Sequence, residues 1–273
     1  MDKKISLKKK VLNWLDENGY PLEMRVASLL RCSKKNETKF DEAPGMEGSY
    51  IRQGSHYQDP ETNSSREIDL IWSHGNFISG ASIDFVIECK NTQKPWILFT
   101  SPEAGSNFNR IFAFGILSKK AKESLFESLG SNGDEAWKRI PWLWKEGGQI
   151  GYGITQAFEG NQDAPYKAIL SAVKASLWLE NDASKKTYSA STCFVAFPVV
   201  VTSSPLFECF LDESGKTVLK EIESGFLFFN QHIGTFQAVC VRVLTQSGLN
   251  NFANECQSIV KELMAVFPQD NKL

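Results

Sequence analysis

Two short apolar segments, REIDLIW (66–72) and DFVIECKN (84–91), set the fold class of this chain. Both are rich in Ile, Leu, Val, Phe and Trp, and a stretch containing Gly and Ser separates them. This pattern is typical of two antiparallel strands joined by a loose connection. The preceding segment, SYIRQGSHYQD, alternates well enough to form a first strand. We therefore expect a three-stranded meander within an α/β fold.

Two segments with helical spacing precede this meander. Leu7, Val11, Leu12 and Leu15 predict a first helix that ends near Asn18-Gly19. A second helix is expected to begin at Pro21, which places Glu23 in its first turn.

The rest of the chain is expected to complete a mixed central β-sheet flanked by α-helices. Helical patterns predict a helical insertion at 100–160, a further helix after Asp163, and C-terminal strands and a helix at 190–268. Although 273 residues exceed the usual length of one domain, α/β enzymes of this size often form one elaborated unit. We expect a single domain over 1–273.

Composition excludes several classes of protein. Hydrophobic residues make up 42% and charged residues 23%, which is typical of globular chains and argues against wholesale disorder. No apolar stretch approaches the ~20 residues that span a bilayer, so we expect a cytoplasmic protein without a membrane partner. The six cysteines show no CxxC pair and no zinc-ligand spacing, and we interpret them as reduced.

The net charge of −2 is a mild argument against a protein that coats nucleic acid non-specifically. It is compatible with an enzyme that needs carboxylates to hold a metal and presents a basic groove elsewhere.

The chemistry is expected at the ends of the two apolar strands. Because side chains alternate along a strand, Glu88 and Lys90 share one face. On the neighbouring strand, Ile68, Leu70 and Trp72 are predicted to share the apolar face, which leaves Asp69 on the other face and able to approach Glu88. Two facing carboxylates repel each other, so the pair favours a bound cation.

A divalent ion with oxygen ligands would meet this need. Mg²⁺ is usually held by one or two carboxylates together with waters and substrate phosphate oxygens. Asp69 and Glu88 supply such carboxylates, and Lys90 would position or deprotonate the attacking water or stabilise developing negative charge.

Asp69, an 18-residue gap and then Glu88-Cys89-Lys90 on an apolar strand resemble the signature of the PD-(D/E)XK nuclease superfamily. The likeness covers roughly residues 20–95, and the order helix, three strands, helix, strand is similar to the superfamily core. Ile68 stands where the signature has proline, which is a common variation.

The resemblance implies a restriction-endonuclease-like fold and assigns roles to individual residues. Asp69 and Glu88 would be metal ligands, the Cys89 backbone carbonyl a further ligand, Lys90 the catalytic lysine and Glu23 an auxiliary acid. The implied activity is hydrolysis of DNA by water with Mg²⁺, for which Mn²⁺ would substitute, by an endonuclease of a prokaryotic restriction, defence or mobile-element system. Cutting both strands would favour a homodimer, and a separately encoded partner protein stays open.

Other interpretations stay open beside this one. The chain could be a catalytically silent module of the same fold that binds nucleic acid or protein, or an unrelated α/β regulatory protein in which Glu88 and Lys90 form a surface ion pair. Lys167 and Lys174 could contact phosphate from their helix or form a solvated stripe. Trp137, Trp142 and Trp144 could stack on bases or pack internally.

Overall fold

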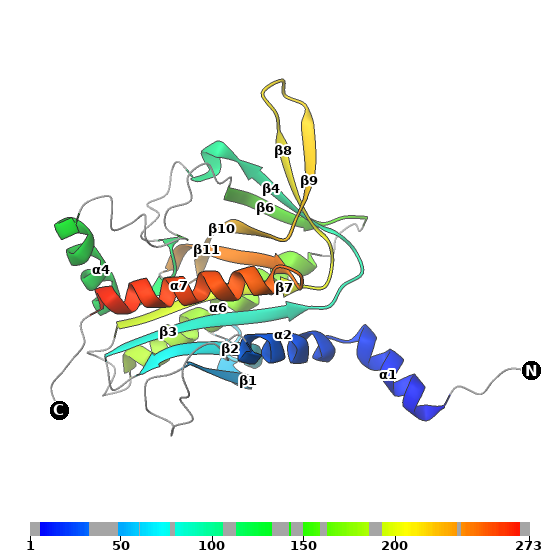
Figure 1. The fold of residues 1–273 in the computed structure, drawn as a ribbon, viewed down its shortest axis with the longest axis horizontal. Helices are drawn as coiled ribbons and strands as arrows, with labels where there is room; N and C mark the ends of the chain where they lie inside the picture. The colour runs from blue at the N-terminus through cyan, green and yellow to red at the C-terminus, as the bar shows by residue number, and fades with distance from the viewer. Residues whose placement is uncertain are drawn as a thin grey trace, which may run out of the picture.

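The computed structural model describes residues 6–32, 49–59, 61–76, 80–105, 113–132, 142, 150–158, 163–185, 193–233 and 236–267. One mixed sheet of eleven strands organises this part of the chain, and helices lie on both of its faces (Figure 1). The predicted α/β class, with a mixed central sheet flanked by helices, is confirmed.

The described helices are α1 (Leu7–Glu17), α2 (Tyr20–Cys32), the 3₁₀ turn η2 (Pro102–Gly105), α4 (Lys119–Asn132), α6 (Ala164–Lys185) and α7 (Leu249–Val266). The strands are β1 (Ser49–Gln58), β2 (Ser65–Asn76), β3 (Ala81–Lys90), β4 (Trp96–Ser101), β5 (Ile116–Leu117), β6 (Ile150–Gln156), β7 (Cys193–Thr202), β8 (Leu206–Leu211), β9 (Thr217–Ile222), β10 (Ser224–Ile233) and β11 (Phe236–Thr245).

The predicted meander is present at one side of the sheet. β1 pairs with β2 and β2 pairs with β3, both in antiparallel register. The two apolar segments therefore lie side by side, with Leu70 opposite Ile87 and Trp72 opposite Phe85.

Beyond the meander the strand order is β3-β7-β11-β10-β6-β4-β8-β9, with β5 paired to β7. β3 and β7 run parallel over their whole lengths. Their C-terminal residues, Lys90 and Thr202, therefore lie side by side at the same edge of the sheet. β8 and β9 form a hairpin that projects from the body of the molecule (Figure 1).

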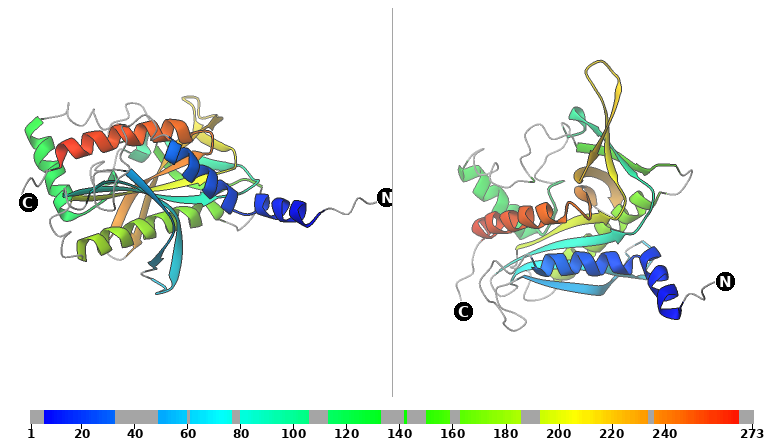
Figure 2. Two further views of the ribbon diagram at one scale, coloured as in Figure 1. Left: turned by 60° about the horizontal axis from the view of Figure 1, so that its bottom comes forward. Right: turned by 45° about the vertical axis from the view of Figure 1, so that its right-hand side comes forward.

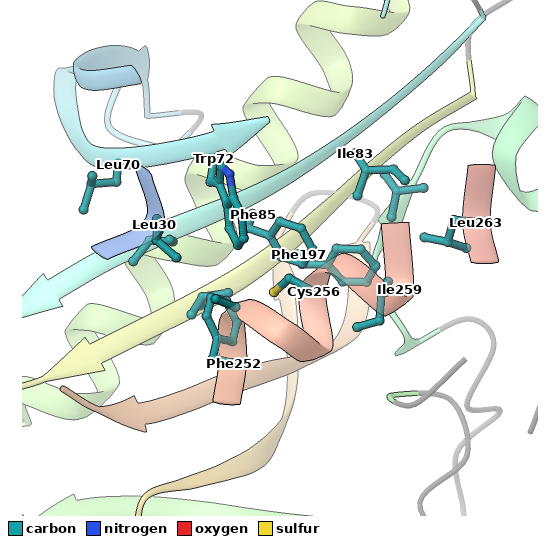
Figure 3. Close-up of a cluster of buried hydrophobic side chains, with 14 of the residues drawn as sticks. Leu30, Leu70, Trp72, Ile83, Phe85, Phe197, Phe252, Cys256, Ile259 and Leu263 are labelled. Carbon is teal, nitrogen blue, oxygen red and sulfur yellow. The ribbon is translucent and has the colours of Figure 1, made fainter. Parts of the chain in front are cut away.

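α2 and α7 cover one face of the meander and β7. Their apolar stripes meet Trp72, Phe85 and Phe197 of the sheet in a continuous core, shown in Figure 3. The Phe85 and Phe197 rings stack with centroids 5.2 Å apart. Leu249, Phe252, Cys256, Ile259 and Leu263 of α7 are buried, as the helical spacing predicts.

α6 covers the opposite face. Figure 2 (left) shows α6 and α7 on the two sides of the sheet. Ile169 and Val173 of α6 belong to one core with Ile71, Val86 and Val200 from the sheet. Asp163 caps this helix, because its Oδ1 accepts a hydrogen bond from the Tyr166 N–H at 3.2 Å.

The expected helical insertion at 100–160 is helical only in part. Its described residues include α4, but β5 and β6 join the central sheet. The sequence of β6 does not predict a strand, because glycine weakens the strand pattern. Packing requires glycine at position 151, since a Cβ there would lie 2.4 Å from Leu98 Cδ1.

Trp142 is partly buried and packs against the core beneath α2 and α7. Its ring lies 5.2 Å from Phe197 and 5.9 Å from Phe252 between centroids, which confirms the packing interpretation for this tryptophan. Trp137 and Trp144 lie outside the described residues. None of the described helices combines the length and the apolarity needed to cross a membrane.

Candidate catalytic site

Asp69 and Glu88 lie where β2 and β3 stop pairing. The ladder runs from Asn76 opposite Ala81 to Leu70 opposite Ile87, and the two acids are the next residues of their strands. Asp69 Oδ2 accepts a hydrogen bond from the Cys89 N–H at 2.7 Å. This bond fixes the Asp69 carboxylate against β3, at the position of Glu88.

The expected alternation along β2 is wrong at Ile68. Leu70 and Trp72 belong to the core beneath α2 and α7, but Ile68 belongs to the core on the α6 side. The partner strand explains the break. Gly54, between the residues paired with Leu70 and Ile68, has a φ of +63°, and a left-handed residue interrupts the regular pleat.

Glu88 and Lys90 project from β3 on the same side, as predicted. Lys90 Nζ lies 2.6 Å from Glu88 Oε1. The Glu88 side chain is only 10% exposed whereas that of Lys90 is 37% exposed, so the ion pair connects a buried carboxylate with solvent.

Glu23 comes from the first turn of α2. Its neighbours Leu22 and Val26 are buried against the sheet, which places the half-buried Glu23 close to the strand ends. Burial raises the pKa of Glu23, and the charges of Glu67 and Glu88 raise it further. The auxiliary acid that the resemblance implies therefore lies within electrostatic reach of Glu88.

The site holds more negative than positive charge. Burial, followed by the charges of Glu88 and Glu23, raises the pKa of Asp69 from 3.8 to about 7, against the opposing hydrogen bond from Cys89. Burial lowers the pKa of Lys90, but Glu88 and Asp69 outweigh it and raise that pKa above its ordinary value. A proton or a cation is therefore favoured at the carboxylates, while Lys90 stays protonated.

The carboxylate oxygens of Asp69 and Glu88 are suitable ligands for a hard divalent cation, but the protein offers few of them. Across the described ranges, no three His, Cys, Asp or Glu side chains are grouped closely enough to hold one ion. Mg²⁺ needs only one or two protein carboxylates when water and phosphate oxygens complete its shell. Asp69 and Glu88 supply two carboxylates, and burial together with the charge of Glu88 raises the pKa of Asp69.

The backbone of Cys89 faces the same space. The Lys90 carbonyl accepts a hydrogen bond from the Ser203 N–H at 3.1 Å and so points toward β7. Because peptide groups alternate sides along a strand, the Cys89 carbonyl points toward β2, on the side of Asp69. Burial raises the pKa of the Cys89 thiol well above its usual range, so the thiol stays protonated and is a poor ligand.

The two lysines of α6 have different surroundings. Lys167 is exposed to solvent. Lys174 is buried, and its Nζ lies 3.2 Å from Asp59 Oδ2 and also pairs with Glu61. A shared solvated stripe is therefore wrong, because Asp59 draws Lys174 into the interior, and Lys167 alone of the two is available to a phosphate.

A polar network beside the site escaped the sequence reasoning. Ser203, which follows β7, donates to Asn91 Oδ1 at 2.8 Å and accepts from the Thr92 N–H at 3.0 Å. Asn91 Nδ2 also donates to the backbone carbonyls of Asp16 and Asn18 at the α1–α2 junction, at 2.8 and 3.1 Å. In the sequence, the only sign of this network is that small polar residues directly follow two apolar strands. This sign is informative only when the two strands are known to be parallel neighbours.

Comparison with protein-family models, with curated proteins and with solved structures finds no match.

Proposed function

We propose that the chain is a metal-dependent nuclease of the restriction-endonuclease-like type, an Mg²⁺-dependent endonuclease that hydrolyses phosphodiester bonds of DNA. One observation carries the proposal: where β2 and β3 stop pairing, the Cys89 N–H holds the Asp69 carboxylate next to Glu88, and Lys90 projects on the same side as Glu88. Glu23 adds a third acid from α2. A surface ion pair alone requires neither the partly buried Asp69 nor a further acid, Glu23, whose charge reaches both Asp69 and Glu88.

Asp69 and Glu88 would hold the ion, with the Cys89 carbonyl as a further oxygen ligand. When bound, Mg²⁺ would polarise the scissile phosphate and lower the pKa of an attacking water. Glu88 is buried and Asp69 is partly buried near it, and two acids in this arrangement are unfavourable without a compensating charge. Mn²⁺ prefers similar oxygen ligands and would substitute.

The state of Lys90 narrows its role. A lysine whose pKa is raised stays charged and is a poor general base. Its partly exposed ammonium is suited to binding a phosphate oxygen and stabilising the negative charge that develops there. Glu23, with its raised pKa, is the better acceptor for a proton released from water.

The setting of a prokaryotic restriction, defence or mobile-element system belongs to this proposal and rests on the resemblance alone. So does the idea that a separately encoded protein completes the active assembly.

A catalytically silent binding module is the second candidate. The observation that favours it is the closed ion pair between Lys90 and Glu88, which already satisfies one carboxylate without a metal. In this case the fold would bind nucleic acid or protein and leave it uncut.

Cleavage assays separate the two candidates. Supercoiled plasmid and labelled oligonucleotides are incubated with Mg²⁺ or Mn²⁺ and with wild type, Asp69→Asn, Glu88→Gln or Lys90→Ala. Glu221→Gln and Lys220→Ala, exposed residues of β9, serve as matched controls. We expect cleavage by wild type and both controls and a loss of at least about 100-fold in the three site variants.

A thermal titration tests the metal separately from catalysis. An ion that binds only the folded state stabilises that state. Mg²⁺ or Ca²⁺ should therefore raise the Tm of wild type but not that of Asp69→Asn or Glu88→Gln. Equal shifts in all three proteins, together with uncut DNA, would favour the silent module.

A further inference from the structure

Asn91 joins three segments that are far apart in the sequence. Its Oδ1 accepts a hydrogen bond at 2.8 Å from Ser203 Oγ, directly after β7. Its Nδ2 donates to the backbone carbonyls of Asp16 and Asn18, at 2.8 and 3.1 Å. The side chain therefore connects the end of β3 to the neighbouring strand and to the α1–α2 junction, which lies beside that end of β3 in Figure 1. We call these three contacts of Asn91 the Asn91 clamp.

Only one orientation of the Asn91 amide suits these contacts. An amide nitrogen has two hydrogens to donate, and two carbonyl oxygens lie within hydrogen-bond distance of it. With the amide turned over, Oδ1 would face these carbonyl oxygens with no hydrogen between them, which is repulsive. The hydroxyl of Ser203 donates to Oδ1 and so favours the same orientation.

The clamp satisfies groups that a helix end leaves without partners. The last carbonyls of an α-helix have no N–H partner within the helix. Asp16 lies in the last turn of α1, and Asn18 is the residue at which the helix ends. Asn91, 75 and 73 residues away from them in the sequence, supplies the donor. Directional hydrogen bonds thus fix the position of the α1–α2 junction against the end of β3.

Glu23 lies directly beyond this junction. Asn18, whose carbonyl Asn91 binds, precedes Gly19, and the Gly19 carbonyl accepts a hydrogen bond from the Glu23 N–H at 3.2 Å. The Glu23 carboxylate lies over the same turn, since a Cβ on Gly19 would be 3.4 Å from Glu23 Oε1. The clamp therefore holds the turn that carries this carboxylate.

The other end of the clamp is next to Lys90. The carbonyl of Lys90 accepts a hydrogen bond from the Ser203 N–H at 3.1 Å, so Ser203 binds Lys90 through its backbone and Asn91 through its hydroxyl. The charges of Glu88 and Lys90 both reach Glu23. A shift of α2 relative to β3 would therefore change the distances from Glu23 to both of these side chains.

We propose that Asn91 is a positioning residue, which keeps Glu23 where it accepts the proton of the attacking water. Asn91 acts through Glu23 rather than on the substrate, because the protein itself accepts the hydrogen bonds of its amide. The effect is large enough to matter, since a misplacement of about 1 Å can lower a rate by about 100-fold. This inference rests on the proposed function and deepens the role given there to Glu23.

Single-turnover cleavage of a labelled DNA duplex with Mg²⁺ is the first test. Asn91→Ala removes the amide, and Asn91→Leu removes it while keeping most of the bulk. We expect the maximal rate to fall about tenfold in both variants, whereas the enzyme concentration for half-maximal rate stays within about twofold, because no contact with DNA is lost. Asn254→Ala, at an exposed asparagine of α7, is the matched control and should cleave like wild type.

A double-mutant cycle distinguishes positioning of Glu23 from a general loss of structure. If Asn91 acts through Glu23, Asn91→Ala should lower the maximal rate by less than about twofold in the Glu23→Gln background, against about tenfold in wild type. A general loss of structure would lower the rate by the same factor in both backgrounds. Enzyme in excess over DNA keeps the slow variants measurable.

Hydrogen exchange with mass spectrometry tests the clamp without activity. Peptides covering 15–24 should exchange faster in Asn91→Ala than in wild type, because the α1–α2 junction is released from the end of β3. Peptides of β7 should exchange as in wild type, which shows that the variant is folded.

Full activity of Asn91→Ala beside an active wild type would overturn the inference and leave the proposed function intact. An equal loss in both backgrounds would overturn it too, as would unchanged exchange at the α1–α2 junction. A wild type that leaves DNA uncut with Mg²⁺ and Mn²⁺ would instead overturn the proposed function, and the role of Asn91 in catalysis with it.

Discussion

Asp69 is subject to two opposing influences. Its carboxylate is held by the Cys89 N–H, yet burial and the charges of Glu88 and Glu23 raise its pKa to about 7. An acid with a raised pKa binds its proton more tightly in the folded state than in the unfolded state. In metal-free protein, stability should therefore fall as the pH rises between about 4 and 7 and change little above that window.

Asp69→Asn should remove this fall in stability. Asparagine can still accept from the Cys89 N–H but carries no charge. We expect the variant to exceed wild type by on the order of 2 kcal/mol in free energy of unfolding at pH 8 with chelator, and to match it at pH 4. Urea unfolding across this pH range measures the difference.

Asp212→Asn is the matched control for this substitution. Bonds from Ser214 and Lys216 lower the pKa of Asp212 in an exposed turn, so its effect on stability has the opposite sign. This variant should keep the decline seen in wild type. A wild-type stability that is flat or rises between pH 5 and 8 would contradict the raised pKa of Asp69.

At the residue scale, sequence patterns predict the site only where the backbone is regular. Alternation correctly places Glu88 and Lys90 on one side of β3, and their 2.6 Å contact confirms it. The same rule fails at Ile68, because the left-handed Gly54 in the partner strand interrupts the pleat. Burial of Lys174 could not be predicted either, since its partner Asp59 is 115 residues away.

Among the elements, α6 is joined to the β1–β2 turn by a buried ion cluster. Asp59 is 1% exposed and receives bonds from Lys174, from Arg66 Nε at 2.7 Å, and from the N–H groups of Glu61 and Thr62. Burial alone would raise the pKa of Asp59, but the N–H groups of Glu61 and Thr62 and the ammonium of Lys174 outweigh it and lower the pKa to about 2.

Lys174→Met should therefore destabilise the protein, because it leaves Asp59 buried with one cation fewer. We expect a loss of about 3 kcal/mol at pH 7. Because the pKa of Asp59 is lowered, this contribution is present above about pH 4 and is lost as the pH falls toward 2. Chemical unfolding at pH 7 and pH 3 gives the comparison.

Lys167→Met, on the exposed side of the same helix, should change stability by less than about 0.5 kcal/mol. If both variants kept wild-type stability, the ion pair between Lys174 and Asp59 would not be a structural contact.

Strand β6 provides a second test of an element. A Cβ at Gly151 would lie 2.4 Å from Leu98 Cδ1 and 3.0 Å from the Phe226 carbonyl oxygen, whereas at Gly153 the nearest atom is 3.8 Å away. Gly151→Ala should cost about 1–3 kcal/mol in free energy of unfolding because two strands must move apart. Gly153→Ala should be neutral or slightly stabilising, and similar losses for both would show that β6 packs differently.

An element could be predicted from the sequence when it buries a large apolar surface. β2, β3, β7, β10 and β11 have apolar runs that predict strands, and the structure confirms them. β6 was missed because its glycines serve packing, and β9, TVLKEI, because it is mostly exposed and polar. Short strands whose side chains face solvent leave little apolar pattern to read.

At the scale of the whole molecule, the order of strands could not be predicted, because it depends on contacts between distant segments. β7 lies directly beside β3, and this pairing creates both the double-sided core and the polar network next to Lys90. The apolar stripes of α6 and α7 predict two helices that cover a sheet, but not which face each one takes.

This arrangement predicts a gradient of stability across the sheet. All ten residues of β7 are buried, and β3 and β11 flank it, so its amides should exchange only when the whole domain unfolds. β9 pairs with β8 alone in the projecting hairpin and is largely exposed, so local opening should suffice for its exchange. Hydrogen exchange with mass spectrometry at increasing urea should show a steep dependence on urea for β7 and a shallow one for β9. Protection of β9 equal to that of β7 would mean that the hairpin is covered in solution, and its loss on dilution would identify a second copy as the cover.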